Sequence, residues 1–218
     1  MSGPGNVTVQ RMVSQPFKVN TYVITKAGAA NCVVIDPGGS DAALPAMLEN
    51  QGLRLDLVLL THEHFDHVTG LKSLLGWQKC EVICARDCAR ALADPRRNLS
   101  QYSMQRESFV SAGRSCEDLG WKLDWREAQF QFHPSPGHSA GGICIGIDNL
   151  LFTGDTLLPG LKRVAHLPGG DRRVLDESLR MIFQRFPAQT LVYPGHGEPF
   201  RLQEVMPAFF PGRKHAAV

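Results

Sequence analysis

One stretch constrains the fold more than any other. The apolar run LDLVLL at residues 55–60 leads directly into THEHFDH at residues 61–67. A short run rich in Leu and Val that ends in polar residues is typical of a buried strand followed by a loop. The loop offers three imidazoles and two carboxylates, which are ligands that zinc and iron prefer. The sequence therefore predicts a metal site at the end of a buried strand.

The side chains of this loop divide between two positions. His62 and His64 are two residues apart, so on an extended segment they point the same way. Asp66 and His67 lie one turn further on and offer ligands for a second ion, whereas alternation places the side chain of Glu63 opposite the first two histidines. A polar loop with accidental histidines is the alternative. It does not explain why five of the eight histidines each follow an apolar run: His62, His64, His67, His138 and His196.

The composition is that of an ordinary globular protein. A chain of 218 residues with 43% hydrophobic and 20% charged side chains has room for one domain, or two at most, with a substantial core. The formal net charge of +2 does not predict nucleic-acid binding. The sequence also contains no run of ~18 apolar residues, which a membrane span would need. Residues 1–6 lack the basic and apolar pattern of a secretory signal. We therefore expect a cytoplasmic protein that forms one domain over residues 1–218.

The six cysteines are not a disulfide scaffold in a chain of this length. Cys80, Cys84 and Cys88 are spaced by four, which would suit a metal or cluster on one helical face. The segment 81–85 (EVICA) is typical of a strand, however, so the three thiols would not share a face. Buried thiols in a reducing cytosol are the preferred interpretation.

Strands and helices alternate along the first half of the chain. Residues 41–51 keep the apolar spacing of a helix, which Asp41 can cap and Gly52 ends. The same criteria predict strands at 7–13, 20–25, 31–35, 55–60 and 81–85, and helices at 41–51, 67–75 and 86–93.

The second half repeats the pattern of a strand that runs into polar residues. It does so at 129–133 before His138, at 150–153 before Asp155 and at 190–193 before His196. A further strand is expected at 142–148, and an apolar stripe over 176–186 indicates a helix packed on the core. Polar groups at strand ends, in a chain of alternating strands and helices, indicate a layered α/β domain with its ligands at one rim of the sheets.

Residues 94–127 do not fit this alternation. The stretch is polar and irregular, and it holds Trp121 and Trp125, two of the three tryptophans. A long connection with little regular structure is often a lid or a functional loop. We therefore expect a lid or insert here. A surface excursion that only covers the core is the alternative.

Four motifs, in this order, resemble the metallo-β-lactamase-fold superfamily: THEHFDH at 61–67, PGH at 136–138, FTGD at 152–155 and PGHG at 194–197. The resemblance extends from about residue 18 to residue 200. It implies an αββα sandwich of two mixed β-sheets flanked by helices, with a metal site at one edge of the sheets. It also implies two divalent metal ions, with Zn²⁺ as the first expectation and Fe or Mn as alternatives.

Carried over residue by residue, the resemblance implies seven metal ligands. One ion would be held by His62, His64 and His138, and the other by Asp66, His67 and His196, with Asp155 bridging the two. Asp36 is expected to support the site or its turn rather than to bind metal. Asp66 is also the expected catalytic carboxylate, because a carboxylate ligand keeps an oxygen that can exchange a proton with water.

Within the superfamily, the chain most resembles the glyoxalase II-like thioester hydrolases, at residues 138–142 (HSAGG), at residues 167–171 (LPGGD) and in the helix that contains Ser178. Three departures accompany this resemblance. Glu63 stands where the family often has His, residues 164–166 read VAH where many members have Arg-x-Asp, and the C-terminal helical extension of full-length glyoxalase II is not seen.

The implied reaction is hydrolysis of an acyl thioester by a metal-bridged hydroxide, in which glutathione need not be the thiol carrier. No protein nucleophile is expected, since neither Ser135 nor Ser139 has a nucleophile-elbow context. The substrate is expected to be a small-molecule or carrier-linked thioester. Lys162 and Arg163 are predicted to meet an anionic carrier, with a solvated basic loop as the alternative, and Tyr102 to line the pocket. Nucleic-acid and membrane partners are not expected, and a homodimer stays open.

Three rival functions fit the same motifs. A mononuclear iron persulfide dioxygenase resembles the chain at residues 62–70 and would need only two histidines and one aspartate. A lactonase would use the same two-ion site on a cyclic ester. A non-enzymatic regulator on this fold is disfavoured, because all seven ligand positions are filled.

Overall fold

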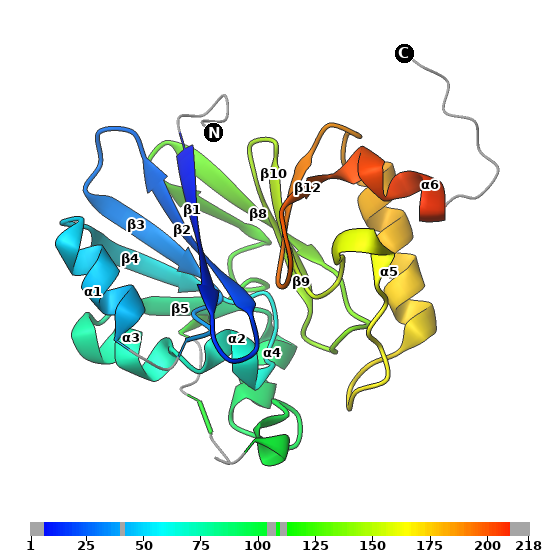
Figure 1. Cartoon of the computed structure of the whole chain (residues 1–218), viewed down its shortest axis with the longest axis horizontal. Coiled ribbons are helices and arrows are strands. Elements are labelled where there is room, and N and C mark those ends of the chain that lie inside the picture. The colour runs from blue at the N-terminus through cyan, green and yellow to red at the C-terminus, as the bar shows by residue number, and fades with distance from the viewer. Residues whose placement is uncertain (1–6, 40–41, 104–107, 110–112, 210–218) are drawn as a thin grey trace.

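The computed structural model describes residues 7–39, 42–103, 108–109 and 113–209. Two six-stranded sheets lie face to face, with helices on their outer sides (Figure 1). This arrangement confirms the αββα sandwich of two mixed sheets expected from the sequence. No helix among the described residues is long and apolar enough to cross a membrane.

The first sheet has the strand order β1-β2-β3-β4-β5-β6. Its strands are β1 (Val7–Ser14), β2 (Val19–Lys26), β3 (Asn31–Ile35), β4 (Arg54–Leu59), β5 (Glu81–Cys84) and β6 (Arg114–Ser115). The first three strands pair antiparallel, and β3 to β6 pair in parallel. The parallel part directs the carboxyl ends of β3, β4 and β5 to one edge.

The second sheet has the strand order β12-β11-β10-β9-β8-β7. Its strands are β7 (Lys122–Trp125), β8 (Ala128–Pro134), β9 (Ile143–Ile147), β10 (Leu150–Gly154), β11 (Leu191–Pro194) and β12 (Phe200–Arg201). Only β10 and β11 pair in parallel, so their carboxyl ends also share an edge.

The helices flank the two sheets. They are α1 (Ala43–Asn50), α2 (Phe65–Val68), α3 (Leu71–Trp77), α4 (Arg86–Leu92), α5 (Arg172–Arg185) and α6 (Met206–Phe209), with 3₁₀ turns η1 (Ser100–Tyr102), η2 (Pro159–Leu161) and η3 (Leu202–Glu204). Helices α1 and α3 cover the first sheet, and α5 covers the second (Figure 1). The buried stripe of α5 packs on Leu151 and Val192, which confirms its predicted role in the core.

Three local predictions need correction. The predicted helix 67–75 is two helices, because the N–H of Gly70 donates to the carbonyl oxygen of Pro37 at 2.8 Å and not to the preceding helical turn. The predicted helix 176–186 begins four residues earlier, since the Asp171 carboxylate accepts hydrogen bonds from the first-turn N–H groups of Arg173 and Val174. The proposed cap at Asp41 lies outside the described residues.

The third correction concerns residues 94–127, which are less irregular than expected. Strand β6 extends the first sheet and β7 extends the second, so the C-terminal part of the segment belongs to the sandwich, and a lid or insert role for this region stays a prediction. The indole of Trp125 donates to a carboxylate oxygen of Asp56 at 2.9 Å, and Arg126 Nε donates to the same oxygen at 2.9 Å. These contacts tie the start of the second sheet to β4.

The first hairpin of the chain holds the two sheets together next to β11. Asn20 Nδ2 donates to the carbonyl oxygens of Pro194, at 2.9 Å, and Gly197, at 2.8 Å. The hydroxyl of Tyr22 donates to the same Pro194 oxygen at 2.6 Å, and its ring packs edge-on against Phe152 at a centroid distance of 5.2 Å. Burial raises the pKa of Tyr22, so its hydroxyl stays protonated and donates.

The Tyr22 contact gives a stability prediction. Tyr22→Phe should lower the free energy of unfolding by about 1 kcal/mol, because one buried hydrogen bond is lost while Pro194 keeps its bond from Asn20. Tyr22→Ala should cost about 3–5 kcal/mol, because the ring is lost as well. Urea unfolding of the metal-free protein measures both. Tyr102→Phe is the matched control and should change little, since Tyr102 is 69% exposed. Equal losses in Tyr22→Phe and Tyr102→Phe would contradict this account.

Candidate metal centre

The candidate metal-binding residues come from the ends of strands in both sheets. The loop after β4 carries His62 and His64 and leads into α2, which carries Asp66 and His67. The other three follow strands of the second sheet: His138 after β8, Asp155 after β10 and His196 after β11. The structure thus brings together all seven residues that the sequence singled out as ligands.

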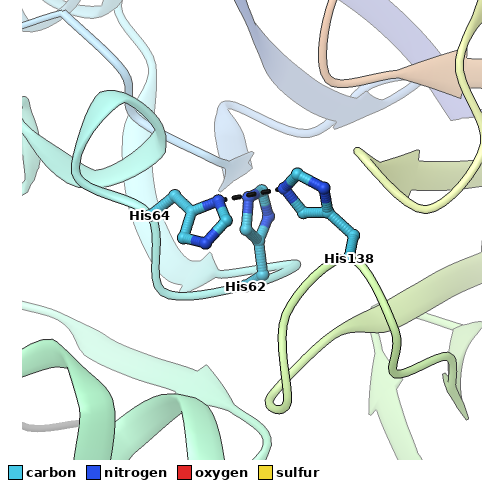
Figure 2. Close-up of side chains that lie close together, drawn as sticks. All are labelled: His62, His64 and His138. Atoms are coloured by element: carbon cyan, nitrogen blue, oxygen red, sulfur yellow. Dashed lines mark hydrogen bonds between the residues drawn. The ribbon is translucent and has the colours of Figure 1, made fainter. Parts of the chain in front are cut away.

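Three imidazoles form a first group. The nitrogens of His62, His64 and His138 that could bind an ion all lie within 4.8 Å of one another. Figure 2 shows His62 and His64 rising from one loop and His138 reaching toward them from another. His138 Nε2 lies 2.9 Å from His64 Nδ1. All three side chains are buried.

The first group is held in the neutral form. Burial lowers the pKa of each of the three rings, and repulsion between neighbouring imidazolium charges lowers the pKa of His62 and His64 further. The pKa of His64 falls to about 3. A neutral imidazole keeps a lone pair, which is the form that binds a metal ion. The first group therefore offers a converging set of nitrogen donors.

A second group mixes charges. Candidate ligand atoms of Asp66, His67 and His196 also lie within 4.8 Å of one another, and His196 Nε2 is 3.4 Å from Asp66 Oδ2. Burial opposes a charge on His67, but Asp66 and Asp155 outweigh it and raise the pKa of that ring well above its usual range. Burial likewise opposes a charge on Asp66, yet the imidazole of His67 lowers the pKa of the carboxyl.

Asp155 lies between the two groups. Its Oδ2 is 3.6 Å from His138 Nε2, in the first group, and 3.6 Å from His196 Nε2, in the second. Its Oδ1 is 3.5 Å from His67 Nε2. Burial would raise the pKa of Asp155, but the neighbouring imidazoles hold it well below its usual range. The carboxylate is therefore ionised and in reach of both groups.

Several buried polar atoms in these two groups indicate whether cations would fit between them. Four of them have no hydrogen-bond partner among the described residues: His62 Nε2, His64 Nε2, His67 Nε2 and Asp155 Oδ1. An unpaired buried polar atom costs about 1–3 kcal/mol, so four within one cluster are unusual. Coordination of divalent cations satisfies imidazole nitrogens and carboxylate oxygens of this kind. The donor set therefore fits metal ions.

The far nitrogens of three rings, those of His62, His67 and His138, each have a second partner. Asp36 Oδ2 lies 3.0 Å from His67 Nδ1, and His138 Nδ1 donates to the carbonyl oxygen of Val164 at 2.7 Å. The hydroxyl of Thr61 lies 3.0 Å from His62 Nδ1. Such partners set the tautomer and the orientation of a ligand ring, leaving the other nitrogen to face the ion. Sequence reasoning gave Asp36 a supporting role but missed Thr61 and the carbonyl of Val164.

Two glycines allow the backbone to pass close to this cluster. A Cβ on Gly195 would lie 2.2 Å from Asp155 Oδ1. A Cβ on Gly154 would lie 2.3 Å from Thr61 Oγ1, and the residue has a φ of +47°. Neither position has room for a side chain.

The residues predicted to contact substrate are placed less centrally. Tyr102 is on η1 and is 69% exposed, and Lys162 is exposed after η2. Arg163 Nε lies 3.0 Å from Asp176 Oδ1, and its guanidinium lies 5.3 Å from the ring centroid of Phe209. Part of the charge of Arg163 is thus balanced by α5. Substrate binding by these three residues stays a prediction.

The cysteines add no metal cluster to the described part of the chain. Cys84 ends β5 and Cys88 is on α4, and both are buried free thiols, as is Cys116. Burial raises the pKa of Cys88, to which the adjacent Cys84 also contributes. Burial also raises the pKa of Cys116, so Cys88 and Cys116 stay protonated, and all three thiols pack in the core.

The chain is similar to a known protein family and to several proteins of known sequence. The family model described as the Metallo-beta-lactamase superfamily matches residues 14–196. Probable metallo-hydrolase YqgX of Bacillus subtilis (strain 168) is 28% identical over 192 residues, which cover 86% of this chain and 89% of that protein. A hydroxyacylglutathione hydrolase of Psychromonas ingrahamii is 29% identical over 185 residues, which cover 80% of this chain but only 60% of that protein.

Two solved structures share the fold of this chain. BLEG-1 B3 metallo-beta-lactamase superposes with a TM-score of 0.83 at 26% identity, over 91% of this chain and 96% of that one. TTHA1623 in a di-iron-bound form superposes with a TM-score of 0.76 at 26% identity, over 91% of this chain and 97% of that one.

The support from Asp36 gives a prediction for the metal-free protein. Asp36 accepts from Thr61 N at 2.8 Å and from Thr61 Oγ1 at 2.6 Å, besides its contact with His67. Asp36→Ala should lower the free energy of unfolding by about 3 kcal/mol or more, because buried donors lose a charged acceptor. Urea unfolding after chelator treatment measures the loss, and Asp36→Asn should be intermediate.

A matched control separates this loss from backbone strain. Asp36 has a φ of +51° and the exposed Asp148 has a φ of +53°, so replacement by Ala strains the backbone alike at both. Asp148→Ala should cost less than about 1 kcal/mol. If the two variants lose the same stability, the contacts of Asp36 do not stabilise the site.

Proposed function

The chain belongs to the metallo-beta-lactamase superfamily, and on that premise we propose that it is a dinuclear metal-dependent hydrolase that cleaves acyl thioesters. The observation that carries the two-ion assignment is the position of Asp155, whose carboxylate is within 3.6 Å of imidazoles in both groups. A carboxylate in that place is suited to bridge two cations.

The proposed ligands follow the two groups. His62, His64 and His138 hold one ion, Asp66, His67 and His196 hold the other, and Asp155 bridges them. Zn²⁺ is proposed first, because neutral imidazoles and carboxylates suit it, and Fe or Mn are alternatives. Two such ions supply a water of lowered pKa and polarise the substrate carbonyl.

The second group is the side open to substrate. Two of its side chains are partly exposed, at 28% for His196 and 18% for Asp66, whereas His138 is at 3% and His67 is fully buried. Oδ2 of Asp66 faces His196 and His67, at 3.4 and 3.9 Å, so Oδ1 is the oxygen proposed to accept a proton from the attacking water. The lowered pKa of Asp66 keeps that carboxylate ionised at neutral pH.

The contacts of the serines and cysteines support a reaction without a protein nucleophile. Ser135 Oγ donates to the carbonyl oxygen of His133, and Ser139 Oγ donates to Glu63, both within the buried interior. Burial raises the pKa of five thiols, which stay protonated at neutral pH: Cys32, Cys80, Cys88, Cys116 and Cys144. None of these groups is activated for attack.

The substrate class rests on the hydroxyacylglutathione hydrolase relative, whose name describes cleavage of a glutathione thioester. This chain spans 60% of the length of that relative, so we propose thioesters in general and not glutathione thioesters alone. The exposed Lys162 is proposed to meet an anionic carrier, with Tyr102 at the edge of the pocket. The partner of Arg163 on α5 makes it the weaker candidate for such a contact.

The first functional prediction concerns metal content and substrate. Purified protein should carry close to two ions per chain by elemental analysis, because the two groups and Asp155 provide seven ligands. It should release free thiol from acyl thioesters, followed with a chromogenic thiol reagent. Faster turnover of lactones than of every thioester tested would refute the thioesterase proposal. A single iron with oxygen-dependent turnover of a persulfide would replace it with a dioxygenase.

The second functional prediction concerns Asp66. Asp66→Ala should lose one of the two ions and lower kcat by about 10³-fold or more, since each factor of ten corresponds to ~1.4 kcal/mol of transition-state stabilisation. Glu177→Gln, at an exposed position on α5, is the control for loss of a carboxylate and should leave both ions and kcat unchanged. An Asp66→Ala protein that keeps two ions and normal turnover would remove Asp66 from the ligand set.

A further inference from the structure

Glu63 is buried on the side of the histidine loop that faces away from the candidate ligands. Alternation along the loop predicts that it points away from His62 and His64, but its burial was not expected: only 2% of the residue is exposed. A buried carboxylate is costly unless donors surround it. Its partners therefore indicate what it does.

Two donors to Glu63 belong to the loop that carries His138, besides the backbone N–H of Glu63 itself and the nearby positive charge of Arg97. Ser139, the residue after His138, donates from Oγ to Glu63 Oε2 at 3.1 Å. The backbone N–H of Gly141 donates to the same carboxylate. Glu63 thus connects two chain segments that come from different sheets and that together supply the first group of imidazoles.

The packing around Gly141 leaves little freedom for this connection to shift. A Cβ at Gly141 would lie 2.7 Å from Glu63 Oε2 on one side. On the other side it would lie 2.4 Å from the backbone nitrogen of Cys88, in α4. The loop is therefore held between the carboxylate and the helix, at backbone contact distance.

One backbone bond accompanies the carboxylate. The N–H of Ile143 donates to the carbonyl oxygen of Thr61 at 2.8 Å, beyond the far end of the loop from His138. Glu63, in contrast, reaches the residue directly beside His138. Its carboxylate is placed to set how closely His138 approaches His64, a nitrogen-to-nitrogen distance of 2.9 Å.

We infer that Glu63 is a positioning residue for the first metal group. Its carboxylate accepts hydrogen bonds from residues 139 and 141 and thereby fixes the position of His138 relative to His62 and His64. The inference rests on the proposed two-ion function. It predicts that loss of the carboxylate weakens the ion at His62, His64 and His138, while the ion at Asp66, His67 and His196 is held as before.

The chemistry of the two donors makes glutamine a partial replacement. Glu63→Gln keeps one acceptor oxygen for the fixed N–H of Gly141. The hydroxyl of Ser139 can rotate to accept from the new amide, so the connection persists in weaker form. Glu63→Ala removes both bonds. If Glu63→Gln binds Zn²⁺ more tightly than Glu63→Ala, the hydrogen bonds to residues 139 and 141 are responsible and the negative charge is not.

The experiment measures Zn²⁺ affinity by competition with a chromogenic chelator, after all metal has been removed. A His196→Ala background weakens the second group, so the affinity of the first group is read separately. In that background Glu63→Ala should weaken Zn²⁺ binding by about 10–100-fold, as loss of a partner that orients a ligand typically does. Glu63→Gln should recover most of the loss, and Glu177→Gln should change nothing.

Three further readouts complete the test. In a His138→Ala background, Glu63→Ala should leave Zn²⁺ affinity within about threefold, because the imidazole that Glu63 is inferred to position is already missing there. Ser139→Ala removes one of the two donors from this loop and should reproduce part of the loss, and the double variant should be no weaker than Glu63→Ala alone. The absorption bands of Co²⁺ bound at the first group should change in Glu63→Ala and return in Glu63→Gln.

The outcomes separate this inference from the function it rests on. Equal losses in the two backgrounds, or lower stability to urea with unchanged Zn²⁺ affinity, would show that Glu63 only supports the fold and would overturn the inference. Binding of a single ion by the wild-type chain would overturn the two-ion proposal. Selective loss of that one ion in Glu63→Ala, with recovery in Glu63→Gln, would still support the positioning role of Glu63.

Discussion

The structure depends on bringing imidazoles and carboxylates together where water is excluded. Burial works against every charged form in this cluster, and the three rings of the first group are kept neutral by it. Partners at the far nitrogens of three rings offset part of this cost: Asp36 at His67, Thr61 at His62 and the carbonyl of Val164 at His138. The carboxyl ends of strands from two sheets are needed to deliver these groups to one place, and close backbone approaches at Gly154 and Gly195 follow from the same crowding.

Much of the candidate site could be predicted from the sequence, because each ligand candidate directly follows an apolar strand. Such a pattern is local, and strand ends in parallel pairs meet at a common edge. The supporting partners could not be read in this way. Val164 acts through a backbone carbonyl, which any residue provides, and the contact of Glu63 with Ser139 joins positions 76 residues apart. Alternation gave the direction of Glu63 correctly but carried no information on what lies opposite.

The fold was predicted well where a hydrophobic pattern extends over many residues. It was predicted poorly where a few hydrogen bonds determine whether a short strand forms or where a helix begins. The two short strands within residues 94–127 exist because β5 and β8 offer edges to pair with, a condition set by the rest of the chain. Helix α5 extends back to Asp171 because the cap satisfies its first N–H groups, although the buried stripe begins later. The predicted contacts of Tyr102, Lys162 and Arg163 rest on charge and aromatic character alone, which do not specify a position.

The bonds from Asn20 and Tyr22 to the segment after β11 have a consequence for the order of assembly. They join positions 172 to 177 residues apart, so nearly the whole chain must be present before they form. Contacts of such long sequence separation form late, because loop closure must precede them. During synthesis from the N-terminus, the loop with His62 and His64 leaves the ribosome long before His196. The second group of candidate ligands is thus completed only when the segment after β11 meets the first hairpin.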